Sequence, residues 1–226
     1  MDHKNLERIM LVFENKQLLE DALCEQIKSD LESAISQYGS AFLLVSGGST
    51  PKALYEKLNK SGLDWSKITV SLVDERFVDN TSAFSNEKLV RESLLANMSE
   101  MNFIPMVFDD SNESKNLELA TKAFEKLNRL DVVILGMGDD GHTASIFPND
   151  EESERAMETS DKLCSTKAPN VPFNRISCSA QFLKSANKTY LFFTGENKLN
   201  VFREAKSKNY PIAHFIEHIT ELYYTN

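Results

Sequence analysis

Residues 41–51, AFLLVSGGSTP, decide the fold class of this chain. The apolar run Ala41 to Val45 is short and is followed by turn residues, which predicts a buried strand rather than a helix. Residues 46–50 then form a tight loop, and Pro51 opens a helix at the position where its missing N–H costs nothing. Strand, loop and helix in immediate succession are the unit from which parallel α/β sheets are built.

The same alternation of short apolar runs with helical periodicity continues along the chain. Further strands are predicted at residues 8–13, 68–73, 131–135, 175–178 and 189–193, with a possible strand near 103–108. Further helices are predicted at residues 16–38, 86–96, 115–128, 179–185 and 196–207. This order predicts an α/β fold, a mainly parallel twisted sheet with helices on both faces in a Rossmann-like three-layer arrangement. The polar residues 149–170 are expected to form a long surface loop or a short helix.

Length and charge limit the class of protein. The 226 residues fit one domain, residues 1–226, and a formal net charge of −9 disfavours nucleic acid and acidic membrane as partners. The apolar runs are about five residues long, whereas a membrane span needs roughly twenty, and the N-terminus leads into no signal-peptide stretch. The three cysteines lack metal-site spacing and are expected to be reduced. We therefore expect a soluble, cytoplasmic protein that is a monomer or a weak homo-oligomer.

The first glycine loop has the composition of an anion site. Gly47 and Gly48 would let backbone N–H groups approach an anion, Ser49 and Thr50 would add hydroxyl donors, and the following helix would point its positive end at the site. The spacing is not that of a Walker loop. Phosphate binding and a plain strand-to-helix turn both remain open for this loop.

A second glycine loop follows the strand at 131–135. Gly136, Gly138 and Gly141 match the dinucleotide pattern GxGxxG, but Pro148 comes soon afterwards, where a long crossover helix would have to continue, so we reject NAD binding. The loop ends in His142, which can accept a proton from water near neutral pH and can be oriented by a nearby carboxylate. The alternative is that this histidine only caps the next helical turn.

Other charged residues complete the candidate site. Asp74-Glu75-Arg76 directly follows the strand at 68–73 and is either part of the site or a solvated charge cluster at a strand end. Arg175 begins a late strand and Lys198 lies in the first turn of a late helix, where each alone would be an ordinary surface cation. His214 and His218 share a helical spacing, but no third ligand is evident, so no metal site is predicted.

These motifs together resemble the family of 6-phosphogluconolactonases. The resemblance is carried by residues 46–51, SGGSTP, by Asp74-Glu75-Arg76 and by residues 136–145, GMGDDGHTAS. Ser85-Asn86, Phe147-Pro148, and the segments 172–177 and 195–198 follow in the order that the family shows. The resemblance implies hydrolysis of 6-phospho-D-glucono-1,5-lactone, a small-molecule phosphosugar lactone, to 6-phosphogluconate in the oxidative pentose phosphate pathway, without a required cofactor. It also implies the phosphosugar isomerase-like α/β fold.

The resemblance assigns roles to individual residues. His142 is similar to the general base that activates water, with Asp140 as its orienting group and Arg76 beside the phosphate or the developing oxyanion. The positions that match those holding the sugar phosphate and lining the substrate site are Gly47, Gly48, Ser49, Thr50, Asp74, Arg175 and Lys198. Phe84 departs from the family, which usually has aspartate there, so the role of that segment is open.

Two other functions compete with lactone hydrolysis. Glucosamine-6-phosphate deaminase has a similar glycine–histidine loop, but its Asn-Glu-Pro motif is replaced here by Ile146-Phe147-Pro148, and it tends to carry tyrosine where this chain has Arg76. A non-catalytic sugar-phosphate sensor is the second alternative. Sensors of that kind that regulate transcription need a DNA-binding module, and no basic patch or helix-turn-helix extension is present in the sequence.

Overall fold

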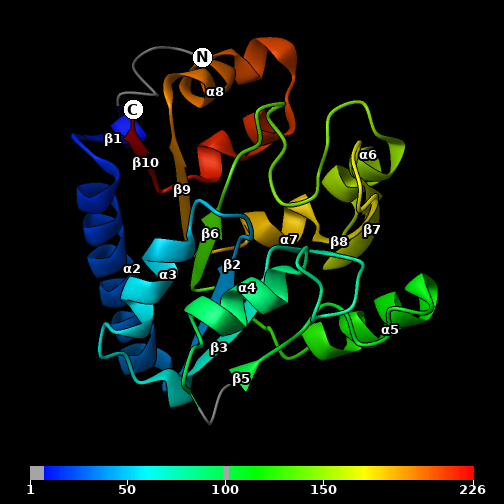
Figure 1. The fold of residues 1–226 in the computed structure, drawn as a ribbon, viewed down its shortest axis with the longest axis horizontal. Coiled ribbons are helices and arrows are strands. Elements are labelled where there is room, and N and C mark those ends of the chain that lie inside the picture. The colour runs from blue at the N-terminus through cyan, green and yellow to red at the C-terminus, as the bar shows by residue number, and fades with distance from the viewer. Residues whose placement is uncertain (1–7, 99–101) are drawn as a thin grey trace.

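The computed structural model describes residues 8–98 and 102–226 and is built around a seven-stranded parallel sheet (Figure 1). The strand order across the sheet is β1-β10-β9-β6-β2-β3-β5, and every neighbouring pair is parallel. Its strands are β1 (Met10–Phe13), β2 (Ala41–Val45), β3 (Ile68–Leu72), β5 (Asn102–Phe103), β6 (Val132–Leu135), β9 (Lys188–Thr194) and β10 (Glu221–Thr225). The predicted mainly parallel α/β sheet is therefore confirmed.

Helices cover both faces of this sheet. They are α2 (Lys16–Tyr38), α3 (Lys52–Asn59), α4 (Asn86–Ser93), α5 (Glu113–Phe124), α6 (Glu151–Glu158), α7 (Ala180–Lys184) and α8 (Glu196–Lys208), with 3-10 helices η1 (Trp65–Lys67) and η2 (Pro211–His218). From β1 to β5, each successive strand lies nearer the β5 edge of the sheet, whereas from β5 to β10 each successive strand lies nearer the β1 edge. Because the crossovers between parallel strands are right-handed, the helices of the first half lie on one face of the sheet and those of the second half on the other. The contacts between helices are consistent with this arrangement. On one side α2 packs against α3 and α3 against α4, and on the other α6 packs against α7, α7 against η2 and η2 against α8.

The longest helix shows how local sequence sets an element. The side chain of Asn15 accepts a hydrogen bond from the N–H of Leu18 at 3.0 Å and so caps the start of α2. Gly39 ends the helix with φ of 78°, a left-handed conformation that glycine adopts without strain. Between these ends, Leu19, Leu23, Ile27 and Leu31 are fully buried, each contributing about 1.5–3 kcal/mol of hydrophobic stabilisation.

The reversal of direction in the sheet positions the site. The loop after β2 leads toward β3 and the loop after β6 leads toward β9, although β2 and β6 are neighbours in the sheet. Between two such strands the outgoing loops separate and leave a crevice at the carboxyl ends, which is where open α/β sheets bind ligands. Both glycine loops identified in the sequence, residues 46–50 and 136–142, flank this crevice.

A second, antiparallel sheet was not predicted. It consists of β4 (Asp74–Arg76), β8 (Asn174–Cys178) and β7 (Leu163–Lys167), in the order β4-β8-β7. Val73 connects the two sheets, because its N–H donates to Val45 of β2 at 3.0 Å and its carbonyl accepts from Cys178 of β8 at 2.8 Å. The second sheet thus carries Asp74, Arg76 and Arg175 to the crevice of the first.

Several expected elements differ in detail. Of the two alternatives for residues 149–170, the short helix is confirmed, as α6 capped by Asp150, whereas strand β7 in the same segment was not predicted. The possible strand near 103–108 is reduced to the two residues of β5, and the C-terminal strand β10 was missed. None of the helices in the described part of the chain is both long and apolar enough to cross a membrane.

Candidate active site

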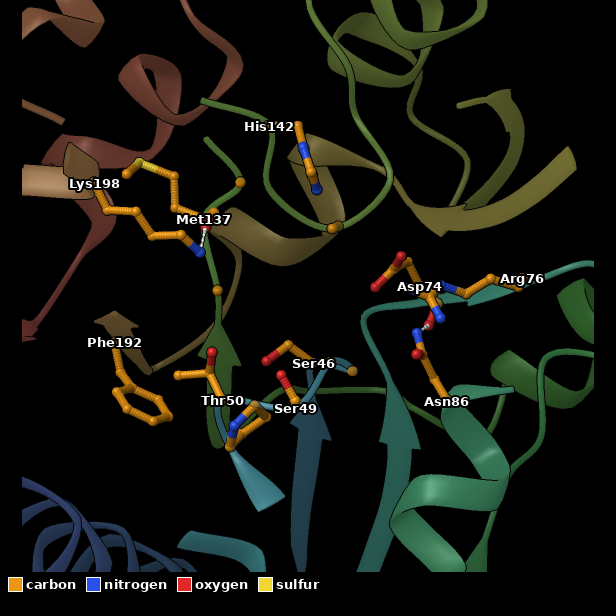
Figure 2. Close-up of a pocket in the computed structure, with 16 residues that line it drawn as sticks. Ser46, Ser49, Thr50, Asp74, Arg76, Asn86, Met137, His142, Phe192 and Lys198 are labelled. Atoms are coloured by element: carbon orange, nitrogen blue, oxygen red, sulfur yellow. Dashed lines mark hydrogen bonds between the residues drawn. The ribbon is translucent and has the colours of Figure 1, made fainter. Parts of the chain in front are cut away.

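Two adjoining hollows form one cleft at the carboxyl ends of the parallel strands. One, of about 300 Å³, lies over the glycine loop after β2, and the other, of about 370 Å³, lies over the second sheet. Asp74, Arg76, His142 and Ala144 line both hollows. Figure 2 shows side chains from the glycine loop, from the loop after β6 and from Asp74 and Arg76 gathered around the first hollow. The catalytic candidates therefore lie where the two hollows meet.

The glycine loop presents free backbone donors to the first hollow. No hydrogen bond within residues 8–98 and 102–226 uses the backbone N–H groups of Gly47, Gly48, Ser49 or Thr50. Gly48 has φ of 90°, which favours glycine, and Gly47 leaves room for a neighbour: a Cβ there would lie 1.9 Å from Oδ1 of Asn86. Four consecutive unpaired N–H groups beside a cavity are the arrangement that binds an oxyanion such as phosphate.

Two helix N-termini adjoin the same hollow without a cap of their own. The side chains of Asn15, Ser85, Asn112, Asp150 and Ser179 cap α2, α4, α5, α6 and α7. The starts of α3 and α8 have no side-chain cap, and residues at both starts, Pro51 and Lys198, line the first hollow. Nζ of Lys198 donates to the carbonyl of Met137 at 2.7 Å, so its charge is fixed at the cleft (Figure 2). Positive helix ends and a lysine together favour an anionic ligand.

His142 is held by its own loop in a defined orientation. Nδ1 of the ring lies 2.5 Å from Oδ1 of Asp140, and the same oxygen accepts the backbone N–H of His142 at 3.1 Å. Burial alone would raise the pKa of Asp140, but the hydrogen bond and the charge interaction with His142 outweigh it and hold this pKa below its usual value. With Nδ1 engaged by a carboxylate, Nε2 is the nitrogen available to take a proton.

The packing around the imidazole keeps it in place. Its centroid lies 4.7 Å from that of the Phe147 ring. A Cβ at Gly138 would lie 2.2 Å from the ring, so only glycine allows the histidine to lie against this backbone. Ala144, between the two hollows, has φ of 49°, a strained conformation for a residue other than glycine, and such strain is concentrated at functional sites.

Two arginines face one another across the second sheet. Arg76 of β4 and Arg175 of β8 are directly paired in register. Arg175 is 8% exposed, its Nε has no hydrogen-bond partner in the described residues, and burial together with the charge of Arg76 lowers its pKa. Like charges directly opposite one another are destabilising. The carboxylates of Asp74 and Glu75 offset part of this repulsion, since both act to raise the pKa of Arg175, and an anion in the cleft would offset it further.

Asp74 is a buried carboxylate shared by both hollows. Its Oδ2 accepts a hydrogen bond from Oγ of Ser145 at 2.5 Å. The serine is held in turn, because its N–H donates to Oγ of Ser177 at 3.2 Å and its carbonyl accepts from Oγ1 of Thr166 at 2.6 Å. Ser145, Ser177 and Thr166 belong to this network but not to the predicted site, since only the fold brings β7 and β8 next to the histidine loop.

The departure at Phe84 has a simple structural account. Arg76 donates through a terminal guanidinium nitrogen to the backbone carbonyl of Phe84 at 2.6 Å. The phenylalanine ring is 55% exposed. Because the carbonyl rather than the side chain makes the contact, many residue types can occupy this position without releasing the arginine.

The predicted site residues come together with one qualification. Gly47, Gly48, Ser49, Thr50, Asp74, Arg76, His142 and Lys198 line the first hollow, and Asp74, Arg76, Asp140, His142 and Arg175 line the second. Arg175 therefore adjoins Arg76 rather than Lys198. Asn86 also lines the first hollow and was not among the predicted residues, although Ser85-Asn86 carried part of the resemblance. Within the described residues, His, Cys, Asp and Glu side chains form no group of three or more that could hold a metal ion.

Comparison with known proteins gives the class. Residues 14–224 match the model of the family described as glucosamine-6-phosphate isomerases/6-phosphogluconolactonase, and the chain belongs to this family. A 6-phosphogluconolactonase from Rhizobium meliloti is 38% identical over 88% of this chain and 87% of its own length. One from Helicobacter pylori is 34% identical over 94% and 96%. The crystal structure of a 6-phosphogluconolactonase from Shewanella baltica superimposes with a TM-score of 0.92 at 34% identity, covering 96% of this chain and 97% of the other.

Proposed function

We propose that the protein hydrolyses 6-phospho-D-glucono-1,5-lactone to 6-phosphogluconate, the lactonase step of the oxidative pentose phosphate pathway. The observation that carries the proposal is a histidine oriented by Asp140 beside a hollow built for an anion. Lactone hydrolysis needs a base for water and positive charge or dipoles for the oxyanion. The names of the relatives described above agree with it.

The phosphate is proposed to occupy the first hollow. The free N–H groups of residues 47–50, the hydroxyls of Ser49 and Thr50, and the start of α8 with Lys198 supply donors and positive charge there. Arg175 adds charge from the adjoining hollow. The net charge of −9 does not oppose such binding, because a small ligand responds to the local potential of the cleft.

His142 is proposed to act as general base and then as general acid. Nε2 takes a proton from water while the water oxygen bonds to the lactone carbonyl carbon, and the carbonyl electrons move onto its oxygen. When the tetrahedral intermediate collapses, the ring C–O bond breaks, and the leaving ring oxygen receives a proton from the imidazolium. Arg76 lines both hollows, which supports a role for its guanidinium beside the negative charge that develops. Asp74 is proposed to bind a substrate hydroxyl.

The test is a comparison of lactone loss with and without the purified protein. The lactone hydrolyses spontaneously, so the rate is followed by proton release, or by NADPH formation with excess 6-phosphogluconate dehydrogenase, against an enzyme-free control. We expect acceleration that saturates with substrate. No acceleration, together with ammonia release from glucosamine 6-phosphate, would instead identify a deaminase.

A further inference from the structure

A buried carboxylate next to the cleft has no place in the mechanism above. Glu75, in the middle of β4, is 1% exposed and is not among the residues lining either hollow. Its Oε1 accepts the N–H groups of Arg76 and Asn86, both at 2.7 Å. Its Oε2 accepts the N–H of Glu87 at 2.7 Å and Oγ of Ser85 at 3.0 Å. Four donors on two oxygens satisfy the carboxylate fully.

Three of these donors belong to the start of α4. Ser85 is the N-cap, and Asn86 and Glu87 are the first two helical residues, whose N–H groups have no partner within a helix. The Glu75 carboxylate, which belongs to strand β4, therefore caps the N-terminus of helix α4 and fixes where that helix begins. A negative charge at this helix end is also favoured by the helix dipole.

Two residues next to the contact between Glu75 and the start of α4, namely Arg76 and Asn86, line the first hollow. The side chain of Asn86 donates from Nδ2 to the carbonyl of Asp74 at 2.9 Å (Figure 2). It also lies so close to Gly47 that a Cβ on that glycine would be 1.9 Å from Oδ1 of Asn86. Arg76, the residue after Glu75, donates to the carbonyl of Phe84, immediately before the N-cap. Each of the three residues 74–76 thus makes a hydrogen bond to the segment 84–87.

We propose that Glu75 is a positioning residue for ligand binding: by capping α4, it sets the places of the Asn86 amide against the glycine loop and of the Arg76 guanidinium. The inference rests on the proposed function only for the choice of ligand. Loss of the carboxylate is expected to weaken phosphosugar binding more than it slows the chemical step, because the His142–Asp140 pair lies on a separate loop.

Protonation of Glu75 gives the proposal a second readout. Burial raises the pKa of Glu75 to about 7, although its four hydrogen bonds act in the opposite direction. Among the charged residues around it, Arg175 on β8 interacts with its charge, Asp74 and Arg76 are its neighbours along β4, and Glu87 on α4 donates its backbone N–H to it. A protonated carboxyl loses acceptor capacity at one oxygen, so binding should weaken as the pH falls through 7.

The experiment compares wild type with Glu75→Gln in the full chain. An amide keeps the shape but turns one acceptor into a donor that faces two other donors. We expect the Kd of 6-phosphogluconate, measured by calorimetry at pH 8, and the KM of the lactone to rise about tenfold or more. We expect kcat to fall by a smaller factor, because His142 and Asp140 keep their places and the Arg76 guanidinium is still held by the Phe84 carbonyl. Glu20→Gln is the matched control, because Glu20 is also a buried glutamate but lies on α2, where it pairs with Lys16 and lines neither hollow. It should bind as wild type does.

Titration then isolates Glu75 from other groups. The ligand phosphate and His142 are common to both proteins, so the ratio of the two Kd values reports Glu75 alone. This ratio should be large at pH 8 and approach one at pH 6. If Glu75→Gln does not fold, Ser85→Gly, which removes one donor to Glu75 and keeps an acceptable N-cap, should raise Kd about threefold.

Each outcome separates the two proposals. A folded Glu75→Gln protein with wild-type Kd and KM at pH 8, a Kd ratio that does not change with pH, or an unchanged Kd in Ser85→Gly overturns the positioning role and leaves the lactonase proposal intact. Wild-type protein that neither binds 6-phosphogluconate nor hydrolyses the lactone overturns the proposed function instead.

Discussion

Replacing Gly138 by alanine tests how strongly lactone hydrolysis depends on the position of the His142 imidazole. A Cβ at Gly138 would lie 2.2 Å from Cε1 and Nδ1 of His142 and 2.8 Å from Oδ1 of Asp140. Carbon atoms in contact are about 3.5–4.0 Å apart, so the ring must retreat by more than about 1 Å. A displacement of about 1 Å at a reacting group can cost about 100-fold in rate.

We therefore expect kcat for the lactone to fall about 100-fold in Gly138→Ala, whereas 6-phosphogluconate binds with nearly unchanged Kd. Gly136→Ala is the control, because a Cβ there would meet only Oγ of Ser46, at 3.8 Å, and neither glycine has a positive φ. Stopped assays of both variants against the spontaneous rate measure the effect. A Gly138→Ala enzyme within threefold of wild-type kcat would refute the requirement for this imidazole position.

Four further predictions address other parts of the molecule. His142→Ala should lower kcat by about 100-fold or more while calorimetry still detects 6-phosphogluconate; unchanged turnover would remove the proposed base. Arg175→Ala should raise KM more than it lowers kcat in steady-state assays, and the opposite pattern would place this residue in the chemistry. Burial raises the pKa of Cys24 to about 11 and of Cys164 to about 12, and that of Cys178 well above its usual value, so a thiol reagent at pH 8 should react slowly until urea exposes all three. Burial raises the pKa of Glu75 in the folded protein to about 7, above its ordinary value of 4.5. The folded state therefore binds a proton more tightly than the unfolded state, and the free energy of unfolding that this adds is present below pH 4.5 and lost as the pH rises through 7. Urea unfolding should show wild type losing stability relative to Glu75→Gln over that range.

The sequence was most informative where hydrophobic periodicity and end signals coincide. The helix predicted at 16–38 and the strand at 41–45 are confirmed residue for residue, since Asn15 and Gly39 mark the helix ends and the strand is buried. Periodicity could not decide between loop and short helix at α6, because its buried residues are only Ser153 and Ala156 and leave no apolar stripe. Hydrophobic periodicity also could not show that β4, residues 74–76, leaves the main sheet and pairs with β8, which lies far along the chain.

The sequence could single out residues that the fold gathers at one cleft, but not the residues that support them. Glycines, a histidine and charged residues at strand ends can be recognised one by one, because each carries its chemistry in its residue type. The roles of Glu75, Asn86 and Ser145 depend on which segments the fold places side by side, and a carboxylate that caps a distant helix has no local signal. A single domain, a cytoplasmic location and a monomeric or weakly oligomeric state stay predictions.

The order of strands has a consequence for how the chain is made. In the described part of the chain, β1 pairs only with β10, so this early strand must wait for a segment that is made much later. Closing so long a loop is entropically costly, and such distant pairings slow folding. Until β10 emerges, the nascent sheet ends at β9 and exposes an unpaired edge, although β2, β3 and β6 can already associate. The cleft can therefore take shape during synthesis, while one side of the sheet is completed only after β10 has been made.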